Sequence, residues 1–143
     1  MIVDEWIRML AMSCLVISSL CLLGGEPPAC LYEYYAPNTI NYYHELQGGI
    51  SKDPEMLVGC AFVALIFSLS LMLAYHRGWY LLCCIFLLLI QSVMLSMIEW
   101  GSVLDMISVN VVYCQNYWVL AWGVGQGLFW LLSLIFIAHE TRD

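Results

Sequence analysis

Two long apolar stretches separated by only three residues most constrain how this 143-residue chain can fold. Residues 57–75 form the first stretch and residues 79–98 the second, and neither contains a charged side chain. At a rise of about 1.5 Å per residue, a helix over either stretch crosses a hydrocarbon layer of roughly 30 Å. The intervening His76-Arg77-Gly78 leaves room only for a direct reversal. The sequence therefore predicts a transmembrane helical hairpin.

The composition agrees with a membrane environment. The chain is 63% hydrophobic and 10% charged, whereas soluble domains carry about 25% charged residues. Its longest polar stretch, residues 24–54, is shorter than the ~40 residues that a unit needs to fold unaided. We therefore expect one membrane domain over residues 1–143.

One further apolar segment lies on each side of the hairpin. Residues 6–23 form the first, and acidic Asp4 and Glu5 ahead of it favour a retained span over a cleaved signal peptide. Residues 117–138 form the last. The predicted fold is an all-α, four-helix transmembrane bundle with a larger first outer loop.

The two outer loops cover residues 24–54 and 100–116. In the second loop, the alternation of Val109, Val111 and Tyr113 predicts a short strand. At the opposite interface, Trp79 and Tyr80 predict an aromatic belt.

Basic residues indicate the orientation. Arg8, Arg77 and Arg142 fall on the side of the hairpin turn, and only Lys52 falls on the other. Cytoplasmic segments carry the excess of Lys and Arg, so both termini are predicted to be cytoplasmic. The net charge of −7 and the lack of a basic cluster argue against a nucleic-acid partner.

Polar residues within the spans are few and neutral. Between their interfaces the four spans hold no Asp, Glu, Lys, Arg or His, which argues against an active transporter. Gln91 and Gln126 lie well inside spans three and four. A buried amide needs a partner, and two interpretations are open: an interhelical hydrogen bond, or contact with a ligand or ion.

Gly123 and Gly127 form a GxxxG motif in the last span. Glycines four residues apart share a helix face and let another backbone approach closely. That face predicts either packing inside the bundle or contact with a second copy or a partner protein.

The seven cysteines divide into two groups. Cys30 and Cys114 are each alone in an outer loop, so a disulfide is predicted if that side is extracellular or luminal. The others fall inside the spans, where thiols behave as small apolar side chains; adjacent Cys83 and Cys84 are open to palmitoylation or to simple packing. These span cysteines are Cys14, Cys21, Cys60, Cys83 and Cys84.

No motif for catalysis is visible. The chain has no Cys-x-x-Cys, HExxH, phosphate loop or nucleophile elbow. We therefore expect no catalytic residue, no cofactor and no metal site.

The first outer loop is rich in tyrosine. Tyrosine offers large amphipathic contact area at low entropic cost, which favours a protein-binding surface; the alternative is a loop that lies on lipid headgroups. The tyrosines are Tyr32, Tyr34, Tyr35, Tyr42 and Tyr43.

Four spans, a larger first outer loop and a tight inner turn resemble the layout of claudins and MARVEL-type tetraspans. The resemblance is one of layout alone. The claudin signature includes tryptophans and two cysteines in the first outer loop, where this chain has no Trp and only Cys30. The resemblance therefore assigns no functional residue.

These features predict a non-catalytic integral membrane protein. We expect an accessory subunit or tetraspan scaffold that contacts the bilayer, other membrane proteins or copies of itself. The alternative is a pore-forming subunit of an oligomeric channel, with Gln91 or Gln126 facing the pathway. A membrane enzyme comes third. The plasma membrane or secretory pathway is the preferred location, and the mitochondrial inner membrane is the alternative.

Overall fold

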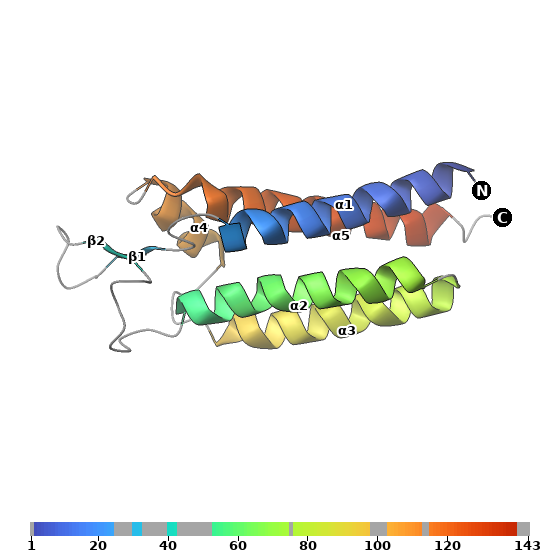
Figure 1. The fold of residues 1–143 in the computed structure, drawn as a ribbon, viewed down its shortest axis with the longest axis horizontal. Helices are drawn as coiled ribbons and strands as arrows, with labels where there is room; N and C mark the ends of the chain where they lie inside the picture. Colours follow the sequence, from blue (N-terminus) through green and yellow to red (C-terminus); the bar gives the residue numbers. More distant parts are fainter. Residues whose placement is uncertain are drawn as a thin grey trace.

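A computed structural model describes residues 2–24, 30–32, 40–42, 53–74, 76–97, 103–112 and 115–139. Four long helices lie side by side in a bundle (Figure 1). They are α1 (Ile2–Gly24), α2 (Asp53–Leu73), α3 (Arg77–Ser96) and α5 (Tyr117–His139). Each is long and apolar enough to cross a membrane, so the predicted set of four helical spans is confirmed.

The ends of the helices alternate along the bundle. The start of α1, the end of α5 and the turn between α2 and α3 lie at one end (Figure 1). We call this the turn end and the opposite one the loop end. The reversal falls on residues 74–76, because α2 stops at Leu73 and α3 starts at Arg77. It lies about two residues earlier than the sequence predicts.

The interior of the bundle follows a heptad-like spacing. Buried side chains recur three and four residues apart on α1 and α5, the pattern that keeps one stripe of a helix against its neighbours. On α1 the stripe is Ala11, Leu15, Ser18 and Leu22; on α5 it is Val119, Trp122, Gln126, Phe129, Ser133 and Phe136. The outward faces remain apolar and exposed, as expected for helices surrounded by lipid.

Helix neighbours are arranged in the order α5–α1–α2–α3, and α1 with α5 form the most extensive pair. Glycine permits the closest approach. A Cβ on Gly125 of α5 would overlap the Ser18 side chain on α1. Likewise, a Cβ on Gly59 of α2 would overlap Met94 on α3. The remaining pair, α3 and α5, meets mainly through longer side chains.

At the loop end, the described residues form one short helix and two short strands (Figure 1). Helix α4 (Val103–Val112) packs on α5, so the predicted strand is wrong at Val109 and Val111, and Tyr113 lies outside the described residues. The physical reason is a competing helical period: Val103 and Ile107, one turn apart, both pack on the Leu22–Trp122 cluster.

Strands β1 (Cys30–Tyr32) and β2 (Ile40–Tyr42) pair antiparallel, with Leu31 opposite Asn41. They belong to the first predicted outer loop, and β1 contacts α4. Just before α5, Gln115 adopts a left-handed conformation with φ of 53°. The Asn116 side chain then caps α5 by accepting a hydrogen bond from the Trp118 N–H.

Candidate functional site

A chain of buried amide and hydroxyl groups connects three of the spans. The Gln91 Nε2 donates to Gln126 Oε1 over 3.3 Å, joining α3 to α5. The Gln126 Nε2 donates to Ser18 Oγ over 3.2 Å, joining α5 to α1. Ser18 Oγ in turn donates to the carbonyl of Leu15 over 3.0 Å. The two glutamines that the sequence singled out are thus brought together inside one chain.

Burial raises the energetic cost of losing these hydrogen bonds. Gln91, Gln126 and Ser18 are each exposed by 7% or less, and an amide without a partner in an apolar interior is costly. Because Gly125 lacks a side chain, α1 comes close enough to α5 for Ser18 to reach Gln126. This geometry supports the interhelical interpretation of the two amides.

A second polar contact joins α3 and α5 nearer the turn end. The hydroxyls of Tyr80 and Ser133 lie 2.8 Å apart, and the Tyr80 ring packs edge-on against Phe136. Sequence reasoning placed Tyr80 in an interfacial belt with Trp79. Trp79 is exposed, whereas Tyr80 is buried. The missed signal was the spacing of Tyr80, Cys84, Leu87 and Gln91, which puts all four on the buried stripe of α3.

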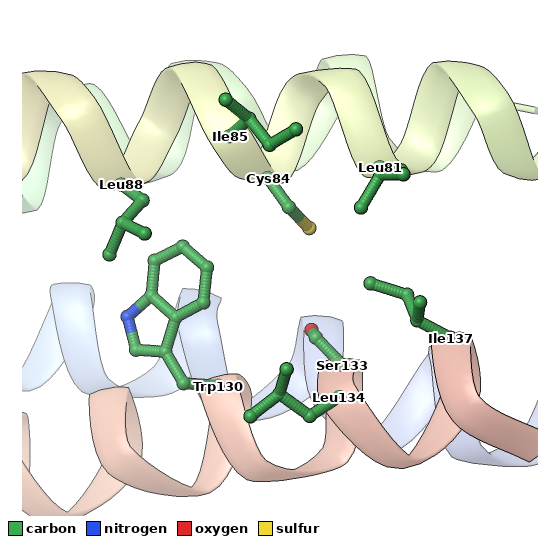
Figure 2. Close-up of a pocket in the computed structure, with 8 residues that line it drawn as sticks. All are labelled: Leu81, Cys84, Ile85, Leu88, Trp130, Ser133, Leu134 and Ile137. Atoms are coloured by element: carbon green, nitrogen blue, oxygen red, sulfur yellow. The ribbon is translucent and has the colours of Figure 1, made fainter.

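From the Gln91–Gln126 contact toward the turn end, α3 and α5 enclose an apolar groove of about 300 Å³ (Figure 2). Cys84 from α3 and Ser133 from α5 are buried at its floor. Trp130 and Ile137 contribute one wall. The rim is exposed and consists of Leu81, Ile85, Leu88 and Leu134. We call this space the α3–α5 groove.

Two arginines tie helices together at the turn end. The Arg8 Nη1 of α1 donates to the carbonyl of Ala74, just after α2, over 3.1 Å. The Arg77 Nη2 of α3 donates to the carbonyl of Ile137 in the last turn of α5. Each guanidinium meets the negative end of a helix, which is the favourable arrangement for a cation.

The glycine motif separates into two environments. A Cβ on Gly123 would lie 2.7 Å from Cδ1 of Ile107 on α4, whereas a Cβ on Gly127 would meet nothing within 4 Å. Within the bundle, close packing thus depends on Gly125 rather than on Gly127. The outward Gly127 stays available for the predicted contact with another chain.

Several predicted residues fall where little can be described. Cys114, Tyr34, Tyr35 and Tyr43 lie outside the described residues, and for Cys30, Tyr32 and Tyr42 the structure places only the backbone, in β1 and β2. The span cysteines form no disulfide, and Cys84 and Cys60 pack in the two hydrophobic core clusters. Across the described ranges, His, Cys, Asp and Glu form no group of three that could hold a metal ion.

Within the described part of the chain, four helices are long and apolar enough to cross a membrane, which indicates a multi-pass membrane protein. No family model, curated protein or solved structure matches the chain.

Proposed function

We propose that this chain is a non-catalytic structural or accessory subunit that packs laterally against other membrane proteins and presents its tyrosine-rich loop for contact. The observation that carries the proposal is the way the buried polar groups of the spans are used. Gln91, Gln126 and Ser18 bond to one another, as do Tyr80 and Ser133. A protein that acts by helix packing needs its buried polar groups to be hydrogen-bonded to one another in this way.

The outward surface of the spans supports lateral contact. Large apolar side chains cover α3 and α5 on the side that faces away from the bundle. On α3 these include Phe86, Leu89 and Val93, and on α5 they include Val124, Leu128 and Leu131. Gly127 lies beside them with open space above it, so another helix can approach closely there.

The loop end offers the second contact surface. Tyr32 and Tyr42 belong to the paired strands, and β1 contacts α4, so the first loop is tied to the second. Arg8 and Arg77 lie at the opposite, turn end. Because basic residues favour the cytoplasmic side, we assign the loop end to the extracellular or luminal side of the plasma membrane or secretory pathway.

Purification tests this proposal. The full chain carries an affinity tag on a part that lies outside the membrane, and it is isolated in mild detergent. The proteins that remain attached are identified by mass spectrometry. We expect a defined set of larger membrane proteins, and we expect Tyr34→Ser/Tyr35→Ser/Tyr43→Ser to reduce their recovery. Tyr117→Ser is the matched control, since Tyr117 is an exposed tyrosine at the same end but outside the loop.

Two outcomes contradict the proposal. One is a chain that remains monomeric and alone under conditions that keep other membrane complexes intact. The other is a homo-oligomer with Gln91 and Gln126 around a central pathway, which would favour the channel. The channel alternative draws no support from the geometry, because these amides are buried against each other.

A further inference from the structure

The α3–α5 groove is a ligand-sized space in the lipid-facing wall of the bundle. We infer that it binds one acyl chain of a phospholipid, with the lipid phosphate held at Arg77. This inference is independent of the proposed accessory role. It concerns a small-molecule site, whereas that role concerns protein contacts.

The position of the groove fits one leaflet. Its lining on α3 runs from Leu81 to Leu88, and seven residues of helix rise about 10 Å. The hydrocarbon core is roughly 30 Å thick, so the groove occupies a minor part of it, mainly toward the turn end. An acyl chain of a lipid in the leaflet at the turn end therefore runs along the groove in the direction that it already has in the bilayer.

The groove has definite ends. Toward the loop end, the Gln91–Gln126 hydrogen bond joins α3 and α5. Toward the turn end, Arg77 donates to the carbonyl of Ile137, which itself lines the groove. Behind the floor, Tyr80 bonds to Ser133. These contacts hold the two helices at a fixed separation, so the groove is part of the packed fold.

The volume and chemistry of the groove favour a flexible chain over a helix. A volume of about 300 Å³ is about ten times the ~30 Å³ of a water molecule, enough for a run of methylene groups. A transmembrane helix with its side chains is about 10 Å across and cannot enter. The lining carries no charged side chain, as a hydrocarbon ligand requires.

Charge complementarity identifies the head of the ligand. Arg77, Leu81 and Leu88 lie four, then seven residues apart on α3, so they share one face of the helix. The guanidinium therefore lies at the interfacial end of the groove. A guanidinium has five N–H donors, one of which goes to Ile137 here. Its planar fork suits phosphate oxygens, and the N-terminus of α3 adds partial positive charge. A phospholipid provides both an acyl chain for the groove and a phosphate for Arg77.

Photolabelling of the full chain tests the inference. The protein is placed in nanodiscs that contain a phosphatidylglycerol with a diazirine on its acyl chain, and labelled residues are mapped by mass spectrometry. We expect labels concentrated in residues 81–88 and 130–137. An excess of unlabelled phosphatidylglycerol should remove these labels, and an uncharged diacylglycerol should not.

Matched variants separate the site from general lipid contact. Leu81→Trp/Leu88→Trp fills the groove and should lower labelling there about tenfold, equivalent to about 1.4 kcal/mol of binding free energy. Leu82→Trp/Leu89→Trp makes the same change one position along, on exposed residues outside the groove, and should leave labelling unchanged. Arg77→Gln should weaken competition by phosphatidylglycerol, whereas Arg8→Gln, which removes the equivalent bond on α1, should not.

The inference is overturned if labels spread evenly over the outward faces of all four spans, or if both competitors act equally. It is also overturned if the groove residues crosslink to another protein instead of lipid. The competition experiment uses the unaltered chain, so it decides the question even if a tryptophan variant fails to fold.

Discussion

The Gln91 side chain of α3 donates to the Gln126 side chain of α5 across the interior of the bundle, at 3.3 Å. Few close backbone contacts join these two helices, so side-chain bonds carry much of their association. Gln126 also bonds to Ser18 on α1. It is therefore the central member of the network, and Gln91 is a terminal one.

That difference predicts unequal effects of substitution. Gln126→Met removes both bonds and strands the Gln91 amide, so we expect a loss of about 1–3 kcal/mol in unfolding free energy. Gln91→Met should have a smaller effect, because the bond to Ser18 remains. Thermal or denaturant unfolding in detergent, followed by circular dichroism, measures both.

The double variant Gln91→Met/Gln126→Met completes the cycle. Since it leaves no amide stranded, its loss should be less than the sum of the single losses, with a coupling of about 0.6–1.7 kcal/mol. Leu88→Met, an exposed change on α3, should be close to neutral. Additive single losses would show that the amides do not interact in the folded protein.

Much of the fold could be predicted because lipid imposes simple requirements. A span must be long, apolar and helical, and four such segments are visible in the sequence. The short reversal at residues 74–76 forces α2 and α3 to be antiparallel. Helix α4 was missed because Val109 and Val111 fit a strand equally well. The packing of Val103 and Ile107 on the Leu22–Trp122 cluster, which the sequence does not show, favours the helix.

The site was predictable only in part. Gln91 and Gln126 stood out because amides are rare at membrane depth. Tyr80 and Ser133 did not stand out. A tyrosine near the end of a span resembles an interfacial anchor, and only the helix packing shows that Tyr80 belongs to the buried stripe of α3. The groove depends on the relative placement of α3 and α5, which no local pattern encodes. Gly125 lies between the two glycines of the GxxxG motif, so the motif does not single it out.

The two neighbouring glycines of α5 should respond in opposite directions to alanine. Gly125→Ala places a Cβ against Ser18, and overpacking of this kind costs about 1–3 kcal/mol. Gly127→Ala meets open space, so the better helix propensity of alanine, up to about 1 kcal/mol, should dominate. Thermal unfolding of the two variants in the same detergent compares them directly.

A second substitution, at Ser18, supplies the control for the two glycine variants. Ser18→Gly removes the Cβ that Gly125→Ala would strike, so the double variant should recover part of the lost stability. If Gly125→Ala stabilises the protein as much as Gly127→Ala, α1 and α5 do not pack as described.

Arg8 should stabilise the turn end through its bond to the Ala74 carbonyl. Arg8→Met keeps the apolar stem and removes the charge. We expect a loss of about 0.5–2 kcal/mol, because one hydrogen bond and one favourable helix-terminus interaction disappear. Arg8→Lys should recover part of it. Equal stability of the unaltered protein and the Arg8→Met variant would mean that the guanidinium makes no net contribution.

Cys30 and Cys114 should form a disulfide when the chain is made in the secretory pathway. Strand β1 begins at Cys30 and contacts α4, which ends at Val112, two residues before Cys114. Peptide mapping without reduction should recover the linked pair, and a loop-closing bond of this kind typically adds about 2–4 kcal/mol. Cys30→Ser and Cys114→Ser should lower the melting temperature equally, and the double variant no further. Two free thiols that react with an impermeant reagent from outside would contradict the bond while supporting the orientation, and labelling from the cytoplasm alone would contradict both.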